Sequence, residues 1–266
     1  MALRGAFRRL RPTATDALRH GAPAMTLYDP HLTPTRRWRL VGAACLLGAA
    51  ALMPPAASAQ YTMEFAQTYA APTSNFISNT FLNQAALINA TRPDAPRAAA
   101  PAALPMAPPQ VERSAAELAQ AAPAAQRARL EKVYTQLMPG YQQLERQLGW
   151  PADDLAGAVV ALLAGNYMAM TGTEPSDQAV SAAGHQLRAS AQLQALLAQL
   201  NATDRRRLYE QCAMLGTFMA LAHRSSQQQP PQVVSNLRHA ARENLRAVLG
   251  PAAEGLSFSA RGLQFR

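Results

Sequence analysis

Residues 155–170 read LAGAVVALLAGNYMAM, and Asn166 is the one strongly polar side chain among these sixteen positions. A helix without a polar face either lies in the centre of a protein or spans a membrane. Sixteen residues are fewer than the roughly 20 that a membrane-spanning helix needs. Asp153 and Asp154 precede the stretch, and carboxylates are typical of the positive end of a helix. The stretch therefore predicts a buried central helix.

Small side chains recur along this predicted helix. Gly157, Ala161, Gly165 and Ala169 are each four residues apart, so they lie on one face of the helix. Side chains of this size allow a neighbouring helix to approach closely. We therefore expect the backbone of another helix to cross here.

Further helices are predicted on both sides from apolar residues spaced three and four positions apart. The expected ranges are 114–122 (with Ser114 and Glu117 as a capping box), 124–148 (kinked or split at Pro139-Gly140), 178–200, 204–222 and 231–249. After Gly250-Pro251, alternating apolar residues indicate an extended tail. The predicted fold is all-α, a single bundle of five to six helices with an extended or short-strand C-terminal tail.

The chain before this bundle divides into two predicted parts. Residues 1–59 form a signal peptide region, with Met25 as an alternative start, and residues 60–113 form a flexible tether rich in proline and alanine. Within the tether, Phe76, Ile77, Phe81, Leu87 and Ile88 fall at helical spacing. They indicate a short helix that packs on the main domain or contacts a partner. The helical domain is expected at 114–250 and the tail at 251–266.

The signal peptide is predicted from three consecutive features. Arg36, Arg37 and Arg39 precede an apolar run from Leu40 to Met53, and Ala57-Ser58-Ala59 follows as a small-residue cleavage site. Cleavage after Ala59 would place the mature protein in the periplasm or outside a bacterial cell. No integral membrane span is expected after cleavage.

Charge and cysteine content limit the functional classes. Residues 1–59 hold eight arginines and two aspartates, which gives +6 of the net charge of +9 and leaves +3 for the mature chain. So small an excess makes no case for nucleic-acid binding. Cys45 lies in the signal peptide, so Cys212 is the one thiol of the mature chain and cannot form an intramolecular disulfide.

Catalytic and metal-binding patterns are weak. His185, His223 and His239 lack the four-residue spacing that places two imidazoles on one metal ion, and no cofactor is expected. Cys212 lies among apolar residues, where thiols are usually inert. The carboxylates of Glu131, Glu145, Asp153 and Asp154 are interpreted as solvated helix faces and a helix start, and Arg205-Arg206-Arg207 as a hydrated helix start. A non-enzymatic protein is therefore expected.

Four residues form a candidate structural or ligand-contact set. Asn166 needs hydrogen-bond partners, because an unpaired buried polar group costs about 1–3 kcal/mol. Tyr209 and Glu210 begin the other strongly apolar helix, and we expect Asn166 to bond with them. Together with Tyr167, they would form a polar clasp or the floor of a small pocket.

Arg238, Arg242 and Arg246 form a stripe along the last helix, four residues apart. Two interpretations remain open for them: a solvated face with local ion pairs, or a contact to an anionic surface such as lipid headgroups.

Residues 141–170, YQQLERQLGWPADDLAGAVVALLAGNYMAM, and residues 208–222, LYEQCAMLGTFMALA, resemble a family of exported bacterial all-helical proteins known only as a domain of unknown function. The similar elements are Asp154-Leu155-Ala156-Gly157-Ala158, Gly165-Asn166-Tyr167-Met168, and Tyr209-Glu210 before Leu215-Gly216. The resemblance covers about residues 115–265. It implies a helical fold and export, and it implies no activity.

Three functions stay open from the sequence. We expect a non-catalytic binding or interaction module of the periplasm or cell envelope, with an unknown protein or envelope partner. One alternative is a carrier of a small apolar ligand, because Met138, Met168, Met170, Met214 and Met219 provide an adaptable interior. The other is a hydrolase of an unrecognised type.

Overall fold

The computed structural model of the chain describes residues 75–81, 85–92, 95–98 and 104–265. All of them belong to one compact unit within residues 33–266. The predicted signal peptide and residues 60–74 of the predicted tether lie outside the described residues.

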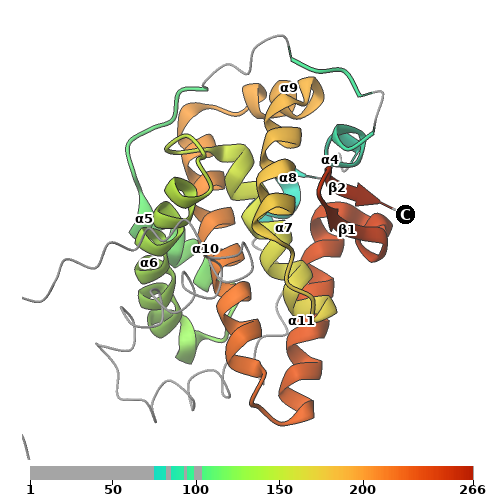
Figure 1. Cartoon of the computed structure of the whole chain (residues 1–266). Helices are drawn as coiled ribbons and strands as arrows, with labels where there is room; N and C mark the ends of the chain where they lie inside the picture. The colour runs from blue at the N-terminus through green and yellow to red at the C-terminus, as the bar shows by residue number, and fades with distance from the viewer. Residues whose placement is uncertain (1–74, 82–84, 93–94, 99–103, 266) are drawn as a thin grey trace, which may run out of the picture. The chain divides into compact units, whose positions relative to one another are not determined.

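The described residues form nine α-helices, one 3-10 helix and a two-stranded hairpin (Figure 1). In chain order the elements are α3 (Asn75–Thr80), α4 (Ala85–Ala90), α5 (Val111–Ala119), α6 (Ala124–Gln147), α7 (Leu155–Thr171), α8 (Asp177–Ala189), α9 (Ala191–Gln199), α10 (Ala202–Ser226), α11 (Pro231–Leu249), η2 (Gly250–Gly255), β1 (Leu256–Ser259) and β2 (Gly262–Phe265). The predicted all-α class and the strand-forming tail are confirmed. Of the helices that the structure describes, none is both long and apolar enough to cross a membrane.

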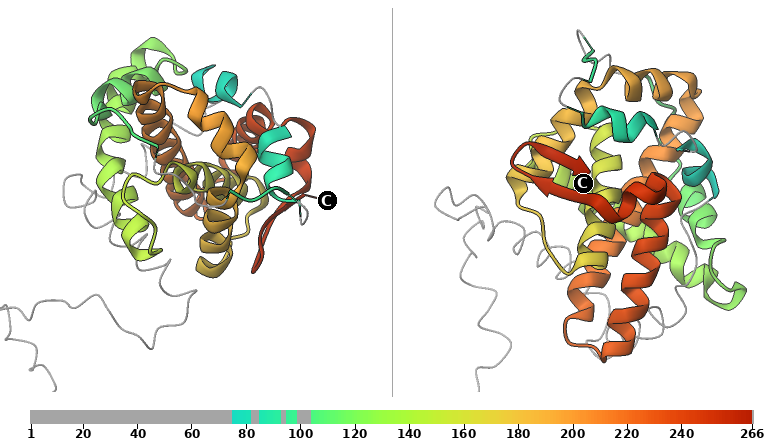
Figure 2. Two further views of the ribbon diagram at one scale, coloured as in Figure 1. Left: turned by 90° about the horizontal axis from the view of Figure 1, so that it is seen from above. Right: turned by 90° about the vertical axis from the view of Figure 1, so that its right-hand side faces the viewer.

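Helix α7 is the predicted central helix. All its residues except Tyr167, Met170 and Thr171 are buried. It contacts α8, α10 and α11, and the view from above in Figure 2 shows it among these helices. The apolar stretch is therefore a core helix, as its sequence indicates.

Helices α7 and α10 cross with their backbones in contact. A Cβ atom added at Gly216 would lie 2.4 Å from the carbonyl carbon and oxygen of Ala161, and one added at Gly165 would meet the Gly216 carbonyl oxygen. The expected close approach is confirmed at Gly165. At Gly157 the neighbour is different, because a Cβ there would meet the Trp150 ring at 2.6 Å. Gly157 thus makes room for a side chain.

Helix α6 continues through Pro139 without the predicted split. Pro139 is on the exposed face of the helix, where water can satisfy the carbonyl group that a proline leaves unpaired.

The predicted capping box at Ser114 is wrong. Helix α5 begins at Val111, so Ser114 is inside it, and its hydroxyl donates a 2.6 Å hydrogen bond to the Glu210 carboxylate. A partner distant in sequence has replaced the local one.

The helix predicted over 178–200 is two helices. Ser190 has extended backbone angles, and its hydroxyl accepts a hydrogen bond from the Leu193 N–H, which caps α9. Serine favours such caps because its side chain competes for backbone groups. Similarly, Asn201 caps α10, which begins at Ala202, two residues before the predicted start.

Much of the predicted tether packs on the domain. Ile77 and Phe81 at α3 and Leu87 of α4 are buried in the same core as α7. The island between 74 and 90 therefore forms two short helices, and α4 lies against α8 and α9. The Arg205 and Arg206 side chains, expected to be hydrated, are buried and donate hydrogen bonds to backbone carbonyls of Pro105 and Ala107. These hydrogen bonds attach the segment that precedes α5 to helix α10.

Candidate anion-binding site

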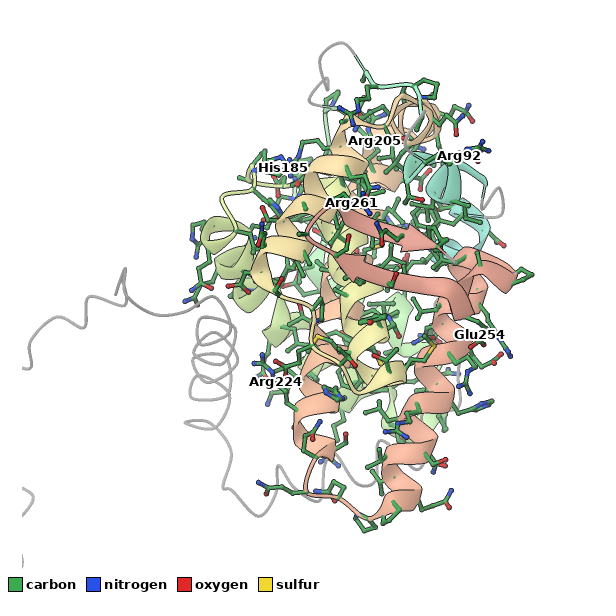
Figure 3. All side chains as sticks on the ribbon, turned by 45° about the vertical axis from the view of Figure 1, so that its right-hand side comes forward. Arg92, His185, Arg205, Arg224, Glu254 and Arg261 are labelled. Carbon is green, nitrogen blue, oxygen red and sulfur yellow. The ribbon has the colours of Figure 1, made fainter. Side chains whose placement is uncertain are left out.

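A pocket of about 920 Å³ opens where α4, the segment 95–98, α8 and the hairpin meet. Five of its lining side chains are basic, and none of its described lining residues is Asp or Glu; the basic residues are Arg92, Arg97, His185, Arg188 and Arg261. Figure 3 labels three of them, from the end of α4, from α8 and from the hairpin turn. We call this pocket the cationic cleft.

A short backbone bridge positions Arg97 at the cleft. The Ala98 N–H donates to the Ala189 carbonyl at 2.8 Å, and the Ala191 N–H donates to the Pro96 carbonyl at 3.1 Å. Arg97 therefore pairs with Ser190 like a strand residue. The break between α8 and α9 frees the groups that form this bridge, because an uninterrupted helix would use them internally.

The Gln186 side chain joins three elements around the cleft. Its Oε1 accepts from the Leu263 N–H at 2.8 Å, and its Nε2 donates to the Leu263 carbonyl at 3.2 Å and to the Thr91 carbonyl at 3.4 Å. Gly262 has a φ of 100° and lies against the same amide. The Gln186 carboxamide thus links the hairpin to α8. The right-hand view of Figure 2 shows the hairpin beside α8.

The basic side chains of the cleft differ in whether they have ion-pair or hydrogen-bond partners. Arg97 and Arg261 are exposed, and within the described part of the chain neither guanidinium has an ion-pair partner. Arg188 is paired with the Asp154 carboxylate at 2.5 Å, and its Nη1 contacts His185 Nδ1 at 3.2 Å. Since arginine only donates, His185 Nδ1 is the acceptor in this contact.

Behind Arg188 lies a buried carboxylate cluster, which the sequence interpretation placed in solvent. Glu145 is only 3% exposed. Its carboxylate accepts from the Asp154 N–H at 3.0 Å and from the Tyr209 hydroxyl at 2.9 Å. Burial raises the pKa of Glu145 to about 7, although these hydrogen bonds act in the opposite direction. The solvated-face interpretation is wrong for Glu145, whereas Asp154 is buried and lies at the start of α7, as the sequence indicates.

Asp153, which precedes Asp154, has an unusual backbone conformation. Its φ of 59° is in the left-handed region, which Asp tolerates better than most residues. Arg206 binds both its oxygens, at 2.8 and 3.0 Å, and chiefly these hydrogen bonds lower the pKa of Asp153. Both aspartates at the start of α7 are therefore paired with arginines.

The predicted bond between Asn166 and the Tyr209–Glu210 region is wrong. Asn166 Nδ2 donates to the Leu162 carbonyl at 2.8 Å, and its Oδ1 accepts from Asn244 Nδ2 of α11 at 2.9 Å. Both asparagines are buried. The partner is on α11 because that helix also packs against α7.

The other predicted residues are dispersed. Tyr167 packs on Phe258 with ring centroids 5.2 Å apart. Tyr209 bonds with Glu145, whereas Glu210 accepts from the Gln110 N–H at 2.8 Å and from Ser114. The structure does not gather Asn166, Tyr167, Tyr209 and Glu210 into one site.

The arginine stripe has local ion pairs. Arg242 and Arg246 bind Glu254 of η2 at 3.3 and 2.8 Å, and Arg246 also binds Glu243. Arg238 is exposed. These contacts favour the solvated-face interpretation, because two of the three cations already have carboxylate partners.

We expect Asn166→Leu to lower the free energy of unfolding by about 1–3 kcal/mol, since the buried Asn244 amide would lose its acceptor. Denaturant unfolding measures this loss. The double variant Asn166→Leu, Asn244→Leu should lose less, because neither polar group remains unpaired. A single variant as stable as the wild type would show that the asparagine pair does not stabilise the fold.

Cys212 and the histidines give no further site. Burial raises the pKa of the Cys212 thiol well above its ordinary range, so the reactive thiolate is disfavoured. Within the described residues, no three His, Cys, Asp or Glu side chains are placed to hold a metal ion.

Sequence reasoning missed the cleft because its cations come from segments far apart in the chain, namely 92–97, 185–188 and 261. Glu145 could have been found. Tyr134, Met138, Tyr141 and Glu145 follow one another at steps of four, three and four, and all are buried. A carboxylate on this buried face predicts a buried acid.

The all-helical fold and the glycine crossing define a helical domain, and comparison of the sequence with known families identifies which one. The Family of unknown function (DUF6683) matches residues 35–266. The chain therefore belongs to this family, and the match includes the proline-rich segment that the resemblance had left out. No curated protein and no solved structure matches the chain.

Proposed function

We propose that the protein is an exported, non-catalytic binding module of the periplasm or cell envelope, and that it holds an anionic ligand in the cationic cleft. The observation that carries this proposal is the lining of the cleft, with five basic residues and no acidic residue among those described. A volume of about 920 Å³ is at the upper end of the range typical of ligand sites.

The chemistry of the lining fits carboxylate, sulfate or phosphate groups. Guanidinium groups bind such anions through two parallel hydrogen bonds. The lining also contains the neutral polar residues Thr91, Gln186, Ser190 and Gln264, whose side chains can bond with an uncharged part of the ligand. No Phe, Tyr or Trp is among the described lining residues, so these residues offer no aromatic ring on which a nucleobase could stack.

The two alternatives have less support. An apolar hollow beside Gly165 and Met168 has a volume of about 50 Å³, which fits a few water molecules and is small for an acyl chain. A hydrolase would be suggested by the raised pKa of Glu145. However, Glu145 is not among the residues that line the cleft.

Binding of a heparin-derived hexasaccharide, measured by titration calorimetry, tests the proposal. Arg97→Ala combined with Arg261→Ala should weaken binding about tenfold, since each exposed ion pair contributes up to about 1 kcal/mol. The same loss of charge at Arg242 and Arg246 is the matched control, and it should change affinity less than twofold. Equal weakening in both double variants would mean that binding follows overall charge and would contradict the proposed site.

Export has its own test. We expect the protein recovered from the periplasm to begin at Gln60, because Ala57-Ser58-Ala59 is a cleavage site of the signal-peptide type. N-terminal sequencing reports this directly. A mature protein that retains Trp38 or Leu40 would contradict cleavage.

A further inference from the structure

Arg188 connects the cationic cleft to the interior. It lines the cleft and also lines a second pocket of about 290 Å³ together with Asp153, Asp154 and Arg206. Its Nη2 and Nε both donate to the Asp154 carboxylate, at 2.5 and 3.4 Å. The charge of Arg188 is therefore shared between the cleft on one side and a buried carboxylate on the other.

Asp154 in turn contacts Glu145. The backbone N–H of Asp154 donates to Glu145 Oε1, while its side chain binds Arg188. On the opposite side of Glu145, the Tyr209 hydroxyl donates to Oε2, and the Tyr209 ring lies edge-on to that of Tyr141 at 5.8 Å. Two successive contacts, from Arg188 to Asp154 and from Asp154 to Glu145, thus link the cleft to a buried acid.

The remaining charged groups near Glu145 have partners of their own. On α10, Arg206 lies 5.4 Å from the Tyr209 ring centre and pairs with Asp153, and Glu210 accepts from Ser114. On α5, Glu117 pairs with Arg113 and accepts from Gln211. Arg188 is the cleft residue that binds Asp154, so an anion in the cleft would affect the ionisation of Glu145 through Arg188.

We propose that binding of an anion in the cationic cleft is coupled to the uptake of a proton by Glu145, with Arg188 and Asp154 carrying the coupling. This inference rests on the proposed function and adds a proton as a second ligand of the same site.

The direction of the coupling follows from charge. An anion that binds Arg188 partly neutralises its charge, so less positive charge remains to balance Asp154. The anion also adds negative charge near Glu145. Both effects make the ionised form of Glu145 less favourable. Because the pKa of Glu145 is already about 7, a further rise converts ionised into protonated molecules at neutral pH. By linkage, acidification then tightens anion binding by the same factor.

Calorimetric titration with the heparin-derived hexasaccharide at pH 7, in buffers of different ionisation enthalpy, measures the coupling. The sulfate groups of this probe keep their charge across the pH range. We expect uptake of a fraction of a proton per molecule bound, and affinity about fivefold higher at pH 6 than at pH 8.5. The experiment is run in a His185→Gln background, which removes the imidazole of the cleft itself.

Glu145→Gln should abolish both the proton uptake and this pH dependence. Glu112→Gln is the matched control, since Glu112 is exposed on α5 and outside the cleft lining, and it should behave as the wild type. Carbon-13 NMR of the Glu145 carboxyl gives a measurement without substitution at Glu145. Its pKa should be higher by about 0.8 in the saturated protein, which is the shift that a fivefold change in affinity requires.

Two failures are distinguishable. Binding that depends on Arg97 and Arg261 but leaves the pKa of Glu145 unchanged would overturn the coupling and keep the proposed function. Absence of binding at both pH values would overturn the proposed function itself.

Discussion

Gly216→Ala is expected to lower the free energy of unfolding by about 3 kcal/mol or more, and to lower Tm by roughly 6–12 °C. The added methyl group would lie 2.4–2.5 Å from the Ala161 carbonyl group and the Leu162 nitrogen. These are backbone atoms of the central helix, so no rotamer change can relieve the overlap. Thermal unfolding followed by circular dichroism measures the effect.

The direction in which a Gly→Ala change shifts the free energy of unfolding distinguishes a backbone contact from ordinary helix propensity. Replacing a helical glycine by alanine ordinarily favours the helix by about 1 kcal/mol. Gly157→Ala should cost less than Gly216→Ala, because its closest neighbour is the Trp150 side chain, and a Trp150→Leu background should recover part of the cost. A Gly216→Ala protein as stable as the wild type would contradict the backbone contact between α7 and α10.

Glu145→Gln is expected to stabilise the protein by about 3 kcal/mol at pH 8 and to leave it nearly unchanged at pH 4. In the folded state burial raises the pKa of Glu145 from 4.5 to about 7, so the folded state binds more protons than the unfolded state between these values. The wild type should therefore be most stable below pH 4.5 as far as this group is concerned, and lose stability until pH 7. The difference between 4.5 and about 7 corresponds to about 3 kcal/mol.

Denaturant unfolding of both proteins at half-unit steps from pH 4 to pH 8 measures this difference. The subtraction isolates Glu145, because Glu210, whose pKa is also raised by burial, and His223, whose pKa burial lowers, titrate in both proteins. Parallel pH profiles would show that folding leaves the pKa of Glu145 unchanged.

The central elements were predictable because their reasons are local. The apolar run from 155 to 170 has no face that water could solvate, and α7 is observed at Leu155–Thr171. Pro231 and Gly250 mark the ends of α11 in the sequence as in the structure. Local signals were not always read correctly, because the caps at Ser190 and Asn201 also act within one turn and were not predicted.

Three of the failures involve partners from distant segments. Ser114 is a good cap by its type, yet it bonds with a carboxylate 96 positions away. Asn166 was assigned the polar groups of the wrong neighbouring helix, because spacing along a helix does not say which of two helices packs against a given side chain. The cleft is the extreme case, since none of its three contributing segments carries an anion-binding pattern by itself.

The short backbone bridge at Arg97 has a consequence for folding order. Residues 96–98 pair with residues 189–191, and Gln186 bonds with residue 263. Contacts over such sequence separations form slowly, because the intervening chain must first lose its freedom. During synthesis from the N-terminus, residues 96–98 are made long before residues 189–191, with which they pair. The cleft of a newly made chain therefore cannot be complete before the final strand has been made, because Leu263 of that strand binds Gln186.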